Sequence, residues 1–168
     1  MKNIVIVVAS EMQNLELAKK FEEEIVAQGA NAKIVNIVDL DLPMFTTRSE
    51  SLHNPAELLK DIVPTFKNSN GFVFLAPEYN GGTPPVLSNF LAWLSRTSKD
   101  WRENLNGKSA VIGTYSAGNG NSVLMILRTQ LSYLGMNVLG RQIVTTMNKA
   151  LDPESLKSVV SNLLKYSH

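Results

Sequence analysis

The sequence predicts an α/β fold: a three-layer sandwich with helices on both faces of a parallel sheet. Short apolar, β-branched runs alternate with amphipathic helical patterns along all 168 residues. Ile4–Val8 and Gly71–Ala76 are continuously apolar, as expected of strands that are buried on both faces. No internal repeat, low-complexity segment or linker interrupts this order, so we expect residues 1–168 to form one domain.

Five strands are expected, each followed by helical pattern. They are Ile4–Val8, Lys33–Val38, Gly71–Ala76, Ala110–Thr114 and Asn137–Leu139, the last with a possible extension through Gln142–Thr146. Residues typical of helix ends support the assignment. Helices are expected to start at Asn54-Pro55, Pro84-Pro85 and Asp152-Pro153 and to end at Gln28-Gly29 and Gly135. The longest stretch without a pattern runs from about Asp39 to His53, and loops of that length more often serve function or an interface.

Composition and charge exclude several classes of function. Sixteen Lys and Arg residues against fifteen Asp and Glu leave a net charge of +1, which implies no duplex nucleic acid or anionic membrane as partner. The absence of cysteine excludes disulfides, thiolate metal sites and a catalytic thiol. With two histidines in the chain, no metal site is expected. Any chemistry therefore depends on hydroxyls, amides, carboxylates, backbone groups or a bound cofactor.

The N-terminal region contains no expected targeting signal. The apolar run Ile4–Val8 is too short for a signal-peptide core, and Glu11 follows it closely. No stretch approaches the roughly 20 apolar residues that span a bilayer. We therefore expect a cytoplasmic protein without a membrane partner.

Ligands of open parallel sheets bind at the carboxyl ends of the strands. Three loops are expected there: Ala9–Asn14, Ala76–Thr83 and Tyr115–Asn121. The second loop offers the ring of Tyr79, the amide of Asn80 and a glycine pair that lets a ligand approach the backbone. This combination suits a planar heteroaromatic ligand with mixed donors and acceptors, although a plain strand-to-helix turn is the alternative.

The second loop also resembles a family signature. Pro77-Glu78-Tyr79-Asn80-Gly81-Gly82 is similar to the motif of the NADPH-dependent FMN reductases, a flavodoxin-like family of flavin, quinone, chromate and azo-dye reductases. Further matching segments are Asp39–Phe45, Pro84–Asn89, Trp93–Arg96, Asn106–Lys108, Ser116–Gly118 and Leu131–Gly135. The resemblance covers nearly the whole chain and implies a five-stranded parallel sheet in the order 2-1-3-4-5.

The resemblance implies FMN as cofactor and NADPH or NADH as co-substrate. In relatives the signature loop lines the flavin ring, the loop after the fourth strand covers another ring edge, and the first loop cradles the phosphate. The implied cofactor-binding residues are Ser10, Asn14, Pro77, Glu78, Tyr79, Asn80, Gly81, Ser116, Ala117, Gly118 and Gly120. No catalytic side chain is expected, because the flavin itself carries the redox chemistry.

The first loop departs from the family pattern Gly-Ser-x-Arg-x-x-Ser-x-Asn. Ser10-Glu11-Met12-Gln13-Asn14 is about three residues shorter and lacks the arginine of this phosphate cradle. Glu11 adds a negative charge near the expected phosphate, at a cost of roughly 1 kcal/mol. We predict weaker or differently placed phosphate binding than in relatives. In the alternative interpretation, Asn14 only caps the first helix and Ser10 only ends the strand.

The resemblance further implies a small-molecule electron acceptor and a homodimer or homotetramer. The helix after Pro85 agrees with an oligomer, because its apolar residues from Val86 to Leu94 span an arc of roughly 160°. A well-buried helix with Trp93 in the core explains the same arc. Glu78 is interpreted as an oligomer contact rather than a catalytic acid.

Three other functions are kept as alternatives. A flavodoxin-type electron carrier shares the fold, but such carriers are typically strongly acidic. A hydrolase would use Ser116, yet the spacing is one residue too long for Gly-x-Ser-x-Gly and only His168 lies downstream. A homologue that has lost flavin would keep the scaffold as a binding or regulatory module.

Overall fold

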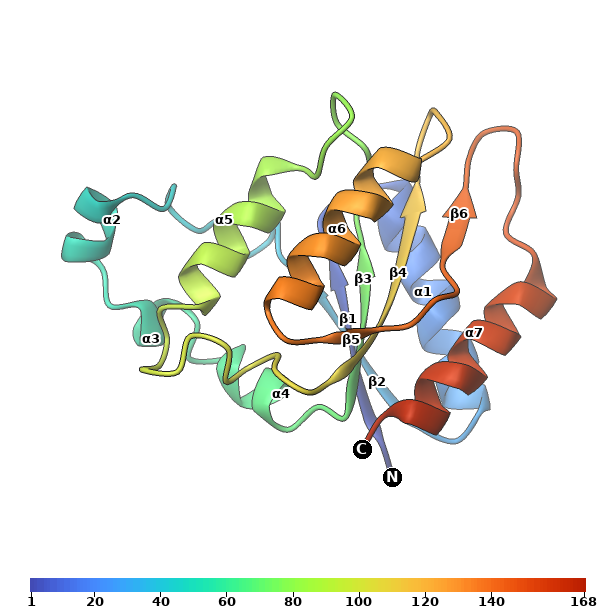
Figure 1. Cartoon of the computed structure of the whole chain (residues 1–168), viewed down its shortest axis with the longest axis horizontal. Coiled ribbons are helices and arrows are strands. Elements are labelled where there is room, and N and C mark those ends of the chain that lie inside the picture. The colour runs from blue at the N-terminus through green and yellow to red at the C-terminus, as the bar shows by residue number, and fades with distance from the viewer.

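A parallel sheet forms the centre of the computed structural model, which describes residues 1–168 (Figure 1). Its strands are β1 (Asn3–Val8), β2 (Asn31–Asn36), β3 (Gly71–Leu75), β4 (Ser109–Tyr115), β5 (Asn137–Val138) and β6 (Ile143–Thr145). They pair in the order β2-β1-β3-β4-β5, and β6 pairs with β4. All these pairings are parallel, so the predicted α/β class and strand order are confirmed.

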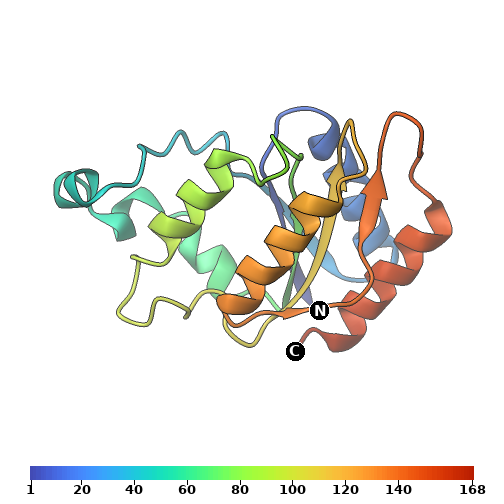
Figure 2. The same cartoon turned by 45° about the horizontal axis from the view of Figure 1, so that its top comes forward.

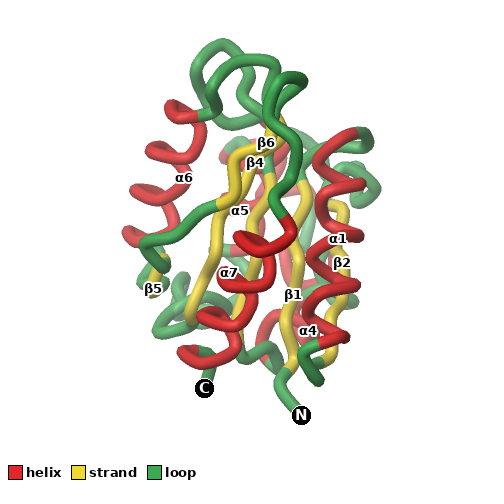
Figure 3. The backbone as a smooth tube through the Cα atoms, turned by 90° about the vertical axis from the view of Figure 1, so that its right-hand side faces the viewer, coloured by secondary structure: helices red, strands yellow, loops and turns green.

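Helices cover both faces of the sheet and complete the predicted three layers. They are α1 (Gln13–Ala27), α2 (Thr47–Leu52), α3 (Pro55–Leu58), α4 (Val63–Lys67), α5 (Pro85–Leu94), α6 (Asn121–Tyr133) and α7 (Pro153–Tyr166). Buried residues of α1 and α7 pack on one face, and those of α4, α5 and α6 pack on the other. Figure 3 accordingly shows α1 and α6 on opposite sides of the sheet. Every helix is too short or too polar to cross a lipid bilayer.

The central strands are buried on both faces, as their continuously apolar sequence predicts. In β1, Val5 and Val7 belong to the core under α5 and α6, whereas Ile4, Ile6 and Val8 belong to the core under α1 and α7. This alternation follows from the two-residue period of a strand. Two apolar layers therefore fix the sheet, and its carboxyl edge is a rigid base for the loops above it.

The expected fifth strand is divided into two pieces: β5 lies within Asn137–Leu139, and β6 lies within the possible extension through Gln142–Thr146. β5 pairs with the start of β4 at Ser109 and Ala110, and β6 pairs with its end from Gly113 to Tyr115. The Arg128 guanidinium on α6 donates to the carbonyls of Val138 and Leu139 at 3.1 and 2.9 Å, where the strand pairing is interrupted. Because β6 reaches the carboxyl edge, it adds one more loop there.

Three short helices replace the single helix expected between the second and third strands. The segment predicted as irregular contains α2, whose first turn is capped by Thr46: the Ser49 N–H donates to the Thr46 hydroxyl at 2.9 Å. Asn54 caps α3 as predicted, since the Ala56 N–H donates to its side-chain oxygen at 3.0 Å. Four to six residues make each helix too short to be marked by an apolar stripe.

The chain itself covers the apolar arc of α5. The Trp93 indole N–H donates to the Pro43 carbonyl at 2.7 Å, and the Phe45 N–H donates to the Asn89 side-chain oxygen at 2.7 Å. The Phe45 ring meets Trp93 edge-on at 5.0 Å between centroids. Trp93 is fully buried. The alternative that places Trp93 in the core is therefore confirmed, and this arc gives no independent support for a partner helix.

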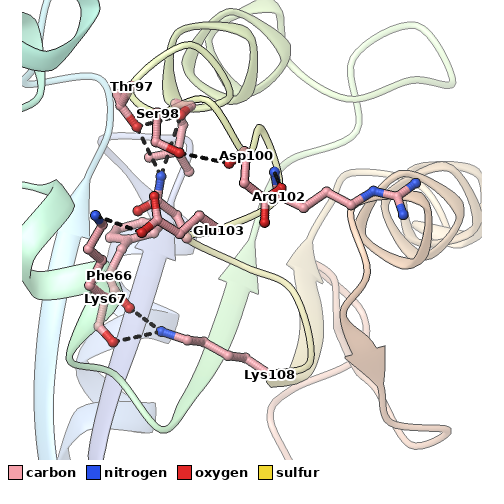
Figure 4. Close-up of polar contacts among 10 residues, drawn as sticks. Phe66, Lys67, Thr97, Ser98, Asp100, Arg102, Glu103 and Lys108 are labelled. Carbon is pink, nitrogen blue, oxygen red and sulfur yellow. Dashed lines mark hydrogen bonds and ion pairs between the residues drawn. The ribbon is translucent and has the colours of Figure 1, made fainter.

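The amino edge of the sheet is closed by a polar network around Lys108 (Figure 4). The Lys108 ammonium donates to the carbonyls of Phe66 and Lys67 at the end of α4, the latter at 3.0 Å. Half-burial lowers the pKa of Lys108. A cation beside the last carbonyls of a helix is favourable, so Lys108 stabilises α4 against the sheet. Lys67 also pairs with Glu103 at 3.0 Å.

Candidate functional site

Besides the segment that follows β2, four loops stand at the carboxyl edge of the sheet, after β1, β3, β4 and β6 (Figures 1 and 2). The first three are those predicted from the sequence. The fourth, Thr146–Asp152, follows the possible extension of the fifth strand through Gln142–Thr146 and was not named as a site loop. The sequence signal for this loop was the apolar pair Ile143–Val144, which lies in β6 and brings the chain to this edge of the sheet.

The loop after β3 is shaped by a two-residue hairpin turn. The N–H groups of Tyr79 and Gly82 donate to each other's carbonyls at 3.0 and 2.9 Å. Asn80 and Gly81 between them have φ angles of 51° and 74°, the combination that a type I′ Asn-Gly turn requires. Tyr79, Asn80 and Gly81 are exposed, and Pro77 is buried beneath them. The loop therefore presents a ring and an amide on a rigid turn.

Glu78 joins this loop to the first turn of α6. Its N–H donates to the Ser116 hydroxyl at 3.2 Å, and its carboxylate accepts from the Val123 N–H at 3.2 Å. The N-cap residue of α6 is Gly120, which has no side chain to satisfy these N–H groups. Glu78 supplies the missing cap from another loop. The structure thus gives the Glu78 carboxylate a structural role inside the chain, and its expected oligomer contact stays a prediction.

Ser116 is buried in a chain of hydrogen bonds between β3 and β4. The Thr114 hydroxyl donates its single proton to the Ala76 carbonyl at 2.7 Å. The 2.7 Å contact between Thr114 and Ser116 is therefore donated by Ser116, which in turn accepts from the Glu78 N–H. The Ser116 hydroxyl is thus used in holding the two loops together.

The same geometry rules out a hydrolase centred on Ser116. The Ser116 residue is 3% exposed and its hydroxyl is hydrogen-bonded on both sides, so the hydroxyl has no free path to a substrate. His168 lies at the opposite edge of the sheet, where its carbonyl accepts from the Asn70 side chain at 3.0 Å. A nucleophile and a base at opposite sheet edges cannot act together, and the hydrolase alternative is wrong.

Asn14 links the first loop to the end of β4. Its side-chain N–H donates to the Tyr115 carbonyl at 3.0 Å, and its side-chain oxygen accepts from the Tyr115 N–H at 2.7 Å. The residue is 2% exposed. The N-cap of α1 is Met12, so the interpretation of Asn14 as the helix cap is wrong. Since this pairing uses both ends of the amide, Asn14 has its backbone N–H to offer a phosphate.

Replacing Asn14 by aspartate is expected to lower the free energy of unfolding by about 2 kcal/mol or more, because N14D removes a donor and sets a buried charge against the Tyr115 carbonyl. Urea denaturation at neutral pH measures the loss. The matched variant Q13E, on an exposed neighbour, is expected to change stability by less than about 0.5 kcal/mol. Equal stability of N14D and the wild type would contradict this assignment.

The loop after β1 holds backbone donors at the start of α1. The N–H groups of Glu11, Gln13 and Asn14 donate no hydrogen bond, and no side chain caps the 15-residue helix. The Ser10 hydroxyl has one long contact, from the Met12 N–H at 3.4 Å. Unpartnered N–H groups at a helix start fit a phosphate. The loop contains no basic side chain, so this fit rests on neutral donors.

The predicted site residues divide into two groups. Groups that reach solvent belong to Ser10, Tyr79, Asn80, Gly81, Ala117 and Gly118. Residues that hold the loops from within are Asn14, Pro77, Glu78, Ser116 and Gly120. The structure adds two buried threonines that the sequence did not single out, Thr114 and Thr145. The Thr145 hydroxyl donates to the Thr114 carbonyl at 3.1 Å, which ties the β6 end to the same network.

Comparison with known proteins agrees with this geometry. Residues 2–150 match the family described as NADPH-dependent FMN reductase. An uncharacterized protein of Mycoplasma pneumoniae is 24% identical over 155 residues, which are 90% of each chain.

Two solved structures share the flavodoxin-like fold at low identity. One is FerB of Paracoccus denitrificans, a flavoenzyme NAD(P)H:(acceptor) oxidoreductase, with a TM-score of 0.79, 18% identity, and coverage of 99% of this chain and 97% of that one. The other is an FMN-dependent NADH-azoreductase of Bacillus anthracis in complex with FMN, with a TM-score of 0.63, 16% identity, and coverage of 98% and 97%. On the match over residues 2–150, the chain belongs to the NADPH-dependent FMN reductase family.

Proposed function

We propose that this chain is a cytoplasmic NAD(P)H-dependent oxidoreductase that passes electrons through bound FMN to a small acceptor such as free flavin or a quinone. FMN is the cofactor of the family. The supporting observation is the pair of exposed loops, 79–81 and 117–118, that Glu78 and Ser116 hold together at the carboxyl edge. When bound, the flavin supplies the redox chemistry, and the protein binds and orients it.

Exposed groups of the two loops would hold the ring. The Asn80 amide carries donors and an acceptor, and it makes no hydrogen bond within the chain, so both remain for the polar ring edge. Ala117 and Gly118 are small and leave one ring face open to the nicotinamide and then to the acceptor. Glu78 positions the loops without moving protons, since its carboxylate accepts from Val123.

The start of α1 would hold the phosphate. The Ser10 hydroxyl and the unpartnered N–H groups of Gln13 and Asn14 are the donors available. Glu11 lies between them with an exposed carboxylate. Neutral donors opposed by one carboxylate are consistent with the weaker phosphate binding predicted from the sequence.

Replacing Glu11 by glutamine is expected to raise FMN affinity about fivefold, because E11Q removes the repulsion of roughly 1 kcal/mol from the phosphate. Riboflavin, which lacks the phosphate, should bind both proteins equally. Flavin fluorescence titrations of the wild type and E11Q with the two ligands measure this difference. An equal gain for riboflavin would place the effect of Glu11 away from the phosphate.

NAD(P)H oxidation by the purified protein with added FMN or a quinone tests the proposed activity. An enzyme of this kind consumes NAD(P)H continuously as long as acceptor remains. An electron carrier of the flavodoxin type shows no turnover alone, and a binding module without flavin shows neither turnover nor flavin binding. The net charge of +1 favours the enzyme over an acidic carrier.

The outer face of α6 is the surface that favours an oligomer. Met125, Ile126 and Tyr133 on it are exposed by 68%, 39% and 68%, and the centroid of the Tyr133 ring lies 5.7 Å from that of the Trp101 ring. We expect a homodimer through this face, because adjoining large apolar side chains are stabilised by burial. Sedimentation should report a dimer for the wild type and a monomer for I126E, with R48E on α2 as control. A monomeric wild type would contradict the assignment.

A further inference from the structure

A hollow of about 470 Å³ lies between the loops after β4 and β6, beside the proposed flavin site. Figures 1 and 2 show these two loops rising next to each other at the carboxyl edge. The volume is within the range of small-molecule sites. One wall of the hollow, Ala117–Asn119, is also the loop that the flavin ring is proposed to contact from its other side. The two sites would therefore share a wall.

The lining of the hollow suits an anionic, hydroxyl-rich ligand. Three amides line it, those of Asn119, Asn121 and Asn148, together with Thr146 and Lys149, and no carboxylate does. The Lys149 ammonium has no ion-pair or hydrogen-bond partner. Amides and a hydroxyl recognise ribose hydroxyls, and a free ammonium recognises phosphate.

The charges around Lys149 leave it available. Glu16 and Lys20 of α1 line the neighbouring hollow together with Lys149. Glu16 is paired with Lys19 at 2.7 Å, and Lys20 is paired with Glu23 at 3.0 Å. At the start of α6, the Glu78 carboxylate already accepts from the Val123 N–H group. The N-terminus of α6 is therefore not expected to attract an anion into the hollow. The positive charge for an anion in the hollow comes from Lys149.

The loop that carries Lys149 is a fixed support. The N–H groups of Thr146 and Lys149 donate to each other's carbonyls at 2.9 and 3.2 Å, which closes a tight turn. The Ser116 N–H donates to the Thr145 carbonyl at 3.1 Å and joins this turn to the wall after β4. The two sides of the hollow therefore keep their spacing without a ligand, which lowers the entropic cost of binding.

We propose that this hollow binds the adenosine diphosphate ribose part of NADH or NADPH, with Lys149 on the diphosphate and the asparagines on the ribose hydroxyls. The proposal rests on the proposed function, because a dinucleotide whose nicotinamide lies on the flavin must extend across an adjacent loop. The hollow directly behind the wall shared with the flavin offers that path. The phosphate of FMN has its own donors at the start of α1, where Gln13 lines the neighbouring hollow that Lys149 also borders, so FMN affinity is measured alongside ADP-ribose binding.

Binding of ADP-ribose, which lacks the nicotinamide, tests this site by isothermal titration calorimetry. Wild type, K149A and the control K99A are compared, because Lys99 is also exposed and unpaired but lies beyond the far end of α5. K149A should bind ADP-ribose roughly tenfold more weakly, the usual value of one charge-assisted contact, and K99A should match the wild type. The KM for NADH or NADPH should rise similarly in K149A, with FMN affinity unchanged.

The outcomes separate this inference from the proposed function. ADP-ribose bound equally by K149A and the wild type, or a loss of FMN affinity instead, would overturn the site while turnover stands. A protein that binds ADP-ribose through Lys149 but neither binds FMN nor oxidises NADH would support the hollow and contradict the proposed function. If K99A raised the KM for NADH or NADPH as much as K149A does, the effect would come from the overall surface charge and the proposal would be overturned.

Discussion

Replacing Gly120 by alanine is expected to lower the free energy of unfolding by about 3 kcal/mol and to weaken FMN binding. Gly120 has a φ of 67°, which strains any residue with a side chain. A Cβ there would lie 2.6 Å from the Thr114 methyl carbon. Thr114 has no room to turn away, because it is fully buried and its hydroxyl is held by the Ala76 carbonyl. The strain therefore falls on the loop that we propose contacts the flavin.

Gly118 provides the matched control in the same loop. A Cβ on Gly118 meets no atom within 4 Å, and its φ is not in the left-handed region. G118A should therefore change the free energy of unfolding by less than about 0.5 kcal/mol. Urea denaturation and FMN titration of G120A, G118A and the wild type compare the three. If G118A were the more damaging of the two, the loop geometry described here would be wrong.

Replacing Glu78 by alanine is expected to reduce FMN affinity roughly tenfold, with a loss in unfolding free energy of about 1 kcal/mol. E78A removes the acceptor of the Val123 N–H and with it the tether between the signature loop and α6. The larger effect falls on the ligand, because a loose loop loses entropy when FMN binds. Fluorescence titration gives the affinity and urea denaturation gives the stability.

Glutamine at the same position tests whether the tether or the charge matters. E78Q keeps an oxygen that accepts from the Val123 N–H, so it should retain most of the FMN affinity that E78A loses. If E78Q were as weak as E78A, the negative charge would be the important property. If E78A bound FMN like the wild type, Glu78 would have no positioning role.

Much of the fold follows from local sequence, and the exceptions come from distant contacts. The apolar strands and the proline-marked starts of α5 and α7 are encoded by neighbouring residues. The break between β5 and β6 is different, because the Arg128 side chain satisfies the carbonyls there from another element. No periodicity within the strand itself encodes that contact.

The same distinction applies to the site. The Asn80-Gly81 turn is a local signal, and its type I′ geometry follows from the residue types. The pairing of Asn14 with Tyr115 joins residues 101 positions apart, and the Glu78 contact with Val123 spans 45. Such contacts depend on which strands are neighbours in the sheet and on how far each loop extends beyond the end of its strand. Sequence reasoning therefore identified the loops, whereas the side-chain contacts of Asn14, Glu78 and Ser116 that hold the loops together were not predicted.

The central claim is that the loops after β1, β3 and β4 form an FMN site used for NAD(P)H oxidation. The visible spectrum of the purified protein, titrated with FMN and then treated with NADH or NADPH without oxygen, tests it most directly. We expect the flavin bands to saturate at one FMN per chain and to bleach when NADH or NADPH is added. A protein that leaves the FMN spectrum unchanged, or bound FMN that NADH and NADPH fail to bleach, would contradict the account.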